Sequence, residues 1–390
     1  TVNADVARTP WNNDTRLLRI GLRGYDVARS ERPAANLVFL VDVSGSMWSR
    51  DKLPLAKCAM AMMAEQLRPD DRISIVTYAG TTQTVLSGSH DKKDVIAALS
   101  KLESGGSTAG AAGIQLAYDA ARKNMIDGGI NRILLATDGD FNVGTTNREQ
   151  LIEMVERERE AGISLTTLGF GTGNYNEAMM EQIADKGNGN YAYIDSPMEA
   201  WRALVDEMSS TLFTIATDVK MQVEFNPAYV SEYRLIGYEN RALDEEDFDN
   251  DAVDAGEIGA GHSVTAIYEV TPVGSPAVKN DPLRYQSETP ARGASEELGF
   301  LRLRYKAPGE AVSQLIETPI PVDATEANVD ARFSVAIAGF GQLLQGSDYL
   351  GEWSWDDAIE IAAGAKGADS FGYRAEAVKL MRLAQSLSAE

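Results

Sequence analysis

The clearest chemistry in the sequence lies in the segment DVSGSM, where Asp42, Ser44 and Ser46 are spaced two residues apart. Two later segments, GGSTAG and TDGD, add further hydroxyl and carboxylate groups, namely Ser107, Thr108, Asp138 and Asp140. None of the three segments contains Cys or His. Carboxylate and hydroxyl oxygens are the ligands that hard cations prefer, so these residues predict a site for Mg²⁺, with Ca²⁺ or Mn²⁺ as alternatives.

The elements that would position these segments form an alternating pattern of strands and helices over residues 33–214, which predicts an α/β domain with a doubly wound, mostly parallel sheet. Strands are expected at 36–43, 72–78, 131–138, 163–170 and 190–194. Helices are expected at 53–67, 92–102, 111–125, 148–160, 176–187 and 197–216. Because ligands bind beyond the carboxyl ends of the strands in such sheets, DVSGSM and TDGD should meet at one edge.

The chain on either side of this domain has other periodicities. Residues 215–330 alternate apolar and polar side chains, as in VKMQVEF and LRLRY, which predicts an antiparallel β-sandwich. The N-terminal segment, 1–32, contains a similar stretch, LLRIGLRG, and is expected to contribute a strand to that sandwich. The α/β domain would then be inserted into the sandwich.

Residues 331–390 contain three short amphipathic patterns and are expected to form a small packed helical region. The last helix carries an apolar stripe that would face its neighbours, made of Tyr373, Ala377, Leu380, Met381, Ala384 and Leu387. A helix that docks a partner is the alternative.

Taken together, the segments DVSGSM, GGSTAG and TDGD resemble the three loops of a von Willebrand factor type A (VWA) domain with a metal-ion-dependent adhesion site. The resemblance covers about residues 33–214 and includes the order of strands and helices. It implies that the metal ligands are Asp42, Ser44, Ser46, Thr108 and Asp138. It also implies a protein partner, because in this family a Glu or Asp of another protein typically completes the coordination of the metal. From the residues alone, helix capping or turn formation by Asp42 and Ser46 remains the alternative.

Segments in and beyond this domain, among them NGNYAYID, YRLIGYENRAL and FSVAIAGFGQLL, resemble the bacterial envelope subfamily of VWA proteins. This resemblance implies a periplasmic or cell-surface protein, secreted or anchored as a lipoprotein, whose signal has been removed, since Thr1 is not an initiator residue. It further implies a non-enzymatic module for adhesion or assembly. Two alternatives stay open: an envelope scaffold whose metal only stabilises the loops, and a metal-dependent hydrolase with Asp140 as the nearest candidate base.

The acidic run DEEDFDNDAVDAGE, residues 244–257, raises the question of a calcium loop. Counted from Asp247, the EF-hand pattern fails, because the position of the required Gly is Ala252 and the twelfth residue is Ile258 instead of Glu. A solvated loop is expected, and a calcium site of another kind stays open.

Three further features favour structural roles. The glycine-rich segment GFGTGNYN lacks the Lys-Ser/Thr pair of a phosphate-binding loop and is expected to be a plain strand-to-helix connection. His90 and His262 are the only histidines, and the sequence has no G-x-S-x-G elbow that would supply a nucleophile for either. Cys58, the only cysteine, lies in a helical apolar pattern and is expected to be a small core residue.

The composition excludes some partners. The 390 residues are 44% hydrophobic and 24% charged, as in ordinary globular proteins. A net charge of −22 argues against binding to nucleic acid or to anionic membrane surfaces, and is compatible with simple solubility. The sequence contains no apolar stretch of the roughly 18 residues that a membrane-spanning helix needs.

Overall fold

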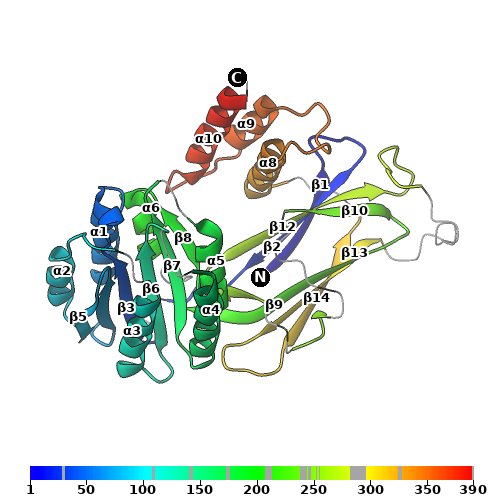
Figure 1. The fold of residues 1–390 in the computed structure, drawn as a ribbon. Coiled ribbons are helices and arrows are strands. Elements are labelled where there is room, and N and C mark those ends of the chain that lie inside the picture. The colour runs from blue at the N-terminus through cyan, green and yellow to red at the C-terminus, as the bar shows by residue number, and fades with distance from the viewer. Residues whose placement is uncertain are drawn as a thin grey trace. The chain divides into compact units, whose positions relative to one another are not determined.

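The computed structural model describes residues 1–28, 31–107, 110–139, 144–172, 176–206, 213–237, 244, 247–251, 253, 255–281, 296–323 and 327–388. Thr108, Asp140 and part of the acidic run lie outside these ranges. The chain forms two compact units (Figure 1). The α/β unit comprises Asp26–Thr214 with Gly259–Gly261, and the β unit comprises Thr1–Tyr25, Ile215–Ile258 and His262–Glu390.

The α/β unit is built on a six-stranded sheet with the order β5-β4-β3-β6-β7-β8. In that order the strands are Thr82–Ser89, Arg72–Tyr78, Ala35–Asp42, Ile130–Thr137, Ser164–Phe170 and Tyr191–Ile194. Neighbouring strands from β4 to β8 are parallel, whereas β5 pairs antiparallel with β4. Strand β3 lies between β4 and β6 and is buried along its whole length, which explains its uninterrupted apolar sequence.

Helices cover both faces of this sheet, as Figure 1 shows. Along β3, Phe39 and Val41 face α1, α2 and α6, while Val38 and Leu40 face α3, α4 and α5. The helices are Leu53–Ala64 (α1), Lys92–Ser100 (α2), Gly110–Lys123 (α3), Gly144–Glu160 (α4), Glu177–Lys186 (α5) and Pro197–Trp201 (α6). Two shorter helical segments are a 3₁₀ turn, η1 (Gly45–Trp48), and a π-helical turn, η2 (Arg202–Asp206).

Two local predictions for this unit are wrong. The helix expected over 197–216 is helical only to Asp206 among its described residues, and strand β9 already begins at Thr214. The β-branched Thr214 and Ile215 favour extended backbone, and Ile215 is buried. Cys58 is exposed instead of lying in the core, because residues such as Leu55 take the buried face of α1.

The β unit contains two four-stranded sheets, with the orders β1-β2-β12-β10 and β11-β9-β13-β14. The first sheet uses Val2–Arg8, Arg16–Arg23, Ser263–Pro272 and Val230–Ile236, and the second uses Gly256–Gly259, Thr214–Phe225, Glu297–Lys306 and Gln314–Pro321. Strand β2 pairs antiparallel with β12, so segments that precede and follow the α/β unit share one sheet. Phe225 in β9 contacts Tyr233 and Tyr268 of the first sheet, with ring centroids 4.3 and 5.6 Å away.

Three C-terminal helices complete the β unit: Val329–Leu344 (α8), Trp355–Gly364 (α9) and Tyr373–Ser388 (α10). Val335 of α8 packs with Trp11, Leu17 and Ile267 of the first sheet and its loop. The apolar stripe predicted for α10 is partly wrong: Met381 is buried, but Leu380 and Leu387 are 53% and 63% exposed. Across the described ranges, no helix combines the length and apolar character that a membrane span requires.

Candidate metal centre

The first loop of the candidate site begins at Asp42, the last residue of β3, whose side chain is fully buried. The backbone N–H of Ser44 donates to Asp42 Oδ1 at 2.8 Å. The hydroxyl oxygens of Ser44 and Ser46 lie 3.0 Å apart. The structure therefore brings the three residues of the DVSGSM segment together at the carboxyl end of the central strand.

The second loop is bonded to the first through the backbone. The N–H of Gly105 donates to the carbonyl of Val43 at 2.7 Å, and the N–H of Gly45 donates to the carbonyl of Gly106 at 3.0 Å. Gly106 has a φ of +86°, and a Cβ there would lie only 3.1 Å from the backbone nitrogen of Gly80, so a glycine is required. Thr108, the ligand predicted from this loop, lies outside the described residues.

The third loop follows β6, which pairs in parallel with β3 and therefore ends beside it. Thr137 at the end of β6 donates its hydroxyl to Asp42 Oδ2 at 3.2 Å and accepts the N–H of Gly139 at 3.1 Å. Asp138 is the next residue and is only 6% exposed. The parallel register thus places a second buried carboxylate near Asp42, while Asp140 lies outside the described residues.

The electrostatics of this edge are unfavourable for two carboxylates alone. Burial raises the pKa of Asp42, the hydrogen bonds from Ser44 partly lower it, and the nearby Asp138 raises it again. Burial and the neighbouring Asp42 also raise the pKa of Tyr78, at the end of β4, well above its usual value. Groups whose pKa is shifted by burial and by neighbouring charges in this way cluster at functional sites.

Lys52 supplies one positive charge to this edge, and the sequence reasoning did not identify it. Its Nζ lies 2.9 Å from Asp138 Oδ2 and donates to the carbonyl of Ser46 at 3.1 Å. The only signal in the sequence is its position shortly after the DVSGSM segment, at the beginning of α1.

The donor set fits a hard divalent cation. Asp42 and Asp138 provide carboxylate oxygens, and Ser44 and Ser46 provide two hydroxyl oxygens that already converge. Within the described part of the chain, no three His, Cys, Asp or Glu side chains come together, and this edge combines two carboxylates with hydroxyl oxygens. Oxygen ligands of this kind suit Mg²⁺ or Ca²⁺ better than the softer transition metals.

The acidic run 244–257 has internal cationic partners where it is described. Asp249 and Asp251 pair with Arg304 at 2.5 and 3.5 Å. The ammonium group of the buried Lys220 donates to the carbonyls of Asp247 and Asn250. At these described positions, cationic side chains contact oxygen atoms of the loop, and a calcium site of another kind stays a prediction.

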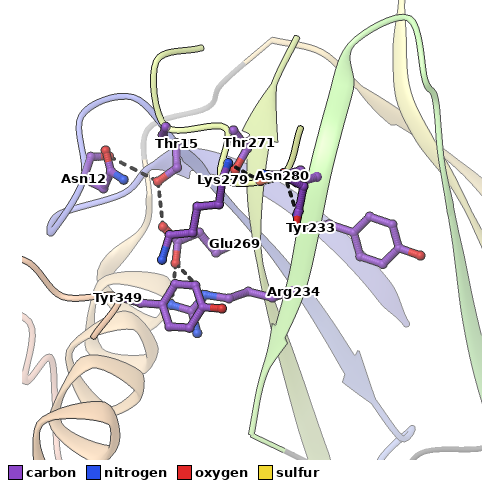
Figure 2. A pocket seen from close by; sticks show the side chains of 11 residues that line it. Asn12, Thr15, Tyr233, Arg234, Glu269, Thr271, Lys279, Asn280 and Tyr349 are labelled. Carbon is purple, nitrogen blue, oxygen red and sulfur yellow. Dashed lines mark hydrogen bonds and ion pairs between the residues drawn. The ribbon is translucent and has the colours of Figure 1, made fainter. Parts of the chain in front are cut away.

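A polar cavity of about 200 Å³ lies in the β unit, and Figure 2 shows the side chains that line it. The buried Glu269 on β12 accepts the Thr15 hydroxyl at 2.8 Å, the Trp11 indole N–H at 3.2 Å and the Arg234 Nε–H at 3.0 Å. Tyr349 packs its ring against the Arg234 guanidinium, 3.8 Å from the ring centroid. These contacts fasten the loop between β1 and β2 to the sheet, so Glu269 has a structural role.

Comparison with known proteins defines the class of this fold. A family model for the von Willebrand factor type A domain matches residues 36–207. A solved structure described as von Willebrand factor type A from Catenulispora acidiphila has a TM-score of 0.52, with 16% identity over 98% of this chain and 88% of that one. The α/β unit therefore has the VWA fold, as the sequence predicted.

A second family model, for the C-terminal part of the uncharacterized protein YfbK, matches residues 210–387. The YfbK protein of Escherichia coli K12 is 48% identical over 389 residues, which are 98% of this chain and 67% of that protein. The chain thus belongs to the YfbK family. An uncharacterized protein of Synechocystis is 29% identical over 206 residues, 52% of this chain and 48% of its own length.

Proposed function

We propose that the chain is a non-enzymatic protein-binding module. Its α/β unit would bind a divalent cation at the carboxyl end of β3, and Mg²⁺ is the preferred candidate. The observation that carries this proposal is the convergence of Asp42, Ser44 and Ser46 with Asp138 at one buried edge. Thr108 would add a further hydroxyl from the second loop. VWA domains commonly mediate protein interactions, and membership of this fold class supports the same role here.

The cation would act as an electrophilic anchor for a partner. Mg²⁺ takes about six oxygen ligands, and the hydroxyls and carboxylates of this chain leave room for an incoming oxygen. The acidic side chain of a partner protein would fill that position. Ser44 and Ser46 carry no charge, which would leave the cation attractive to a further carboxylate.

The proposed setting is the bacterial envelope, on its periplasmic or outer side, for adhesion or assembly. The proposal rests on the resemblance of the chain to envelope VWA proteins. Cell fractionation tests this setting, with the tagged full-length YfbK protein of Escherichia coli as the relative and with periplasmic and cytoplasmic marker proteins as references. Recovery with the cytoplasmic marker would contradict this setting.

Calorimetric titration of Mg²⁺ tests the metal site directly. The wild-type chain should bind one Mg²⁺, whereas Asp42→Ala should bind none in the same concentration range. Glu232→Ala is a suitable control, because Glu232 is a half-buried carboxylate of the β unit that accepts backbone N–H groups. Equal heats of Mg²⁺ binding for wild type and Asp42→Ala would contradict the proposal.

A scaffold role is the second candidate, supported by Leu380, Leu383 and Leu387, which are all more than half exposed on α10. In that case the C-terminal helices would carry the assembly and the cation would only stabilise the loops. A partner captured from envelope extract discriminates the two roles. Binding that is lost in EDTA supports metal-mediated recognition, and binding that survives EDTA supports the scaffold.

A further inference from the structure

We propose that Lys52 is a built-in competing cation that weakens metal binding at this site. This inference rests on the proposed metal centre, and it assigns a role to a residue outside the motif. The ammonium would balance the buried carboxylates when no metal is bound and would oppose the charge of a metal when one enters.

The contacts of Lys52 place its charge between two loops of the site. Its Nζ lies 2.9 Å from Asp138 Oδ2, and it donates to the Ser46 carbonyl at 3.1 Å. The Lys52 and Asp138 side chains are only 17% and 4% exposed, so water screens this ion pair weakly. An incoming cation would have to share Asp138 with the ammonium or displace it.

The position of the ammonium is determined by packing of its aliphatic stem. A Cβ built on Gly171, in the loop after β7, would lie 2.4 Å from Lys52 Cε and 2.5 Å from its Cγ. Gly171 has a φ of +78°, and its carbonyl accepts the Tyr193 hydroxyl at 2.8 Å, which holds this part of the loop. The stem thus lies in a slot that exists because residue 171 has no side chain.

The electrostatic consequence follows from the charges. A positive charge a few ångströms from a divalent cation repels it, and in a weakly screened environment this is worth on the order of tenfold or more in affinity. The same charge would strengthen the attraction of the loaded site for an acidic partner. Lys52 would therefore weaken the binding of the cation alone, and its attraction for the partner's carboxylate would offset that loss when both ligands are bound.

The test measures the dissociation constant of Mg²⁺ by calorimetry for the full chain and four variants. Lys52→Gln keeps an N–H donor for Asp138 and removes the charge, and Lys52→Met removes both. Both should bind Mg²⁺ about tenfold more tightly than wild type. Lys52→Arg keeps the charge and should bind no more tightly than wild type.

Lys92→Met is the matched control for loss of a positive charge, because Lys92 forms an exposed ion pair with Glu65 on the helical layer. It should leave the Mg²⁺ affinity unchanged. Circular dichroism confirms the fold of each variant, and Lys52→Gln remains informative if Lys52→Met fails to fold.

The outcomes separate this inference from the proposed function. If wild type binds Mg²⁺, Asp42→Ala does not, and Lys52→Gln binds no more tightly than wild type, the role of Lys52 is overturned and the metal centre stands. If neither wild type nor Lys52→Gln binds Mg²⁺, the metal centre itself is wrong, and this inference falls with it.

Discussion

At the scale of single residues, the candidate site lowers the stability of the metal-free folded protein. Asp42 is completely buried, and burial raises the pKa of its carboxyl. At neutral pH its ionised form therefore destabilises the metal-free fold relative to the unfolded chain, in which the carboxyl is solvated. Binding sites often lower the stability of the free protein in this way, and replacing the functional residue then raises the free energy of unfolding.

Asp42→Asn should stabilise the α/β unit in EDTA while abolishing Mg²⁺ binding. An amide oxygen can still accept the N–H of Ser44, and the buried charge is lost. We expect a gain of about 1 kcal/mol, equivalent to a rise of roughly 2–4 °C in Tm. The folded pKa of Asp42 is raised, so the destabilisation is present above that pKa and disappears as the pH falls through it. The difference in Tm between the variant and wild type should therefore become smaller in acid.

Thermal unfolding in EDTA at several pH values measures this effect. Asp138→Asn serves as the comparison, because it leaves Lys52 without its carboxylate and should lower Tm instead. A lower Tm for Asp42→Asn than for wild type at neutral pH would contradict the argument.

Glu269→Ala should be among the most damaging substitutions in the β unit. It removes the acceptor of three donors, Thr15, Trp11 and Arg234, and leaves a partly buried guanidinium without its carboxylate. We expect a loss of about 2–4 kcal/mol in the free energy of unfolding. Urea denaturation measures it, with Glu224→Ala as the exposed control at under about 1 kcal/mol, because Glu224 is 67% exposed and its ion pair with Arg302 lies on the surface. Equal losses for the two variants would show that the Glu269 contacts contribute little.

At the scale of elements, helix α9 depends on its first turn. Ser354 and Asp357 form a capping box, in which Asp357 Oδ2 accepts the N–H of Ser354 at 2.8 Å and the Ser354 hydroxyl accepts the N–H of Asp357. The hydrogen bonds from the Ser354 side chain and backbone lower the pKa of Asp357. Both ends of the box therefore favour the ionised carboxylate at neutral pH.

Ser354→Ala should destabilise the β unit by about 1 kcal/mol at neutral pH. Because the folded pKa of Asp357 is lowered, its contribution is present at neutral pH and is lost as the pH falls through that pKa, below about pH 4. The difference in stability between Ser354→Ala and wild type should become smaller in that acidic range. Ser386→Ala on α10 is the control, since its hydroxyl only bonds a carbonyl of its own helix. A difference that stays constant in acid would exclude the role of the Asp357 charge.

The sequence predicted those elements whose burial leaves a continuous pattern. Strand β3 is buried on both faces and therefore carries an uninterrupted apolar run. Strand β5 was not predicted, because its sequence TQTVLSGS is partly exposed and has no such run. The helix over 197–216 was overextended, since an apolar stretch with helical spacing continues into residues that the structure places in β9.

The site was predictable to the same degree. Asp42 ends β3, and Ser44, Ser46 and Asp138 follow strands, so the parallel sheet alone brings their loops to one edge. Lys52 and Gly171 were missed, because their contact depends on side-chain packing between loops that no local pattern describes. Whether these oxygens hold a metal stays a prediction.

At the scale of the whole molecule, the α/β unit interrupts the β unit in sequence, and each has its own apolar core. The two cores of the α/β unit, one on each face of its sheet, contain only residues of that unit. A unit with a complete core can fold independently.

An excised fragment of residues 26–214 should fold cooperatively and bind Mg²⁺ with the same dissociation constant as the full chain. It loses the backbone bond from Ala260 to Phe213, which is a small cost. Circular dichroism and calorimetry on the fragment check both points. The complementary fragment, with residues 1–25 joined by a short Gly-Ser linker to 215–388, should fold without responding to Mg²⁺. An unfolded 26–214 fragment would show that the two units depend on each other.

Gly171 has a consequence for how such a protein could change over time. It is not one of the proposed ligands, and a side chain there would meet the stem of Lys52. If Lys52 has the role proposed above, any side chain at position 171 would move the ammonium away from Asp138 and alter metal affinity with every ligand intact. Relatives adapted to surroundings poor or rich in magnesium could then differ at a glycine, while their coordination motifs remain identical.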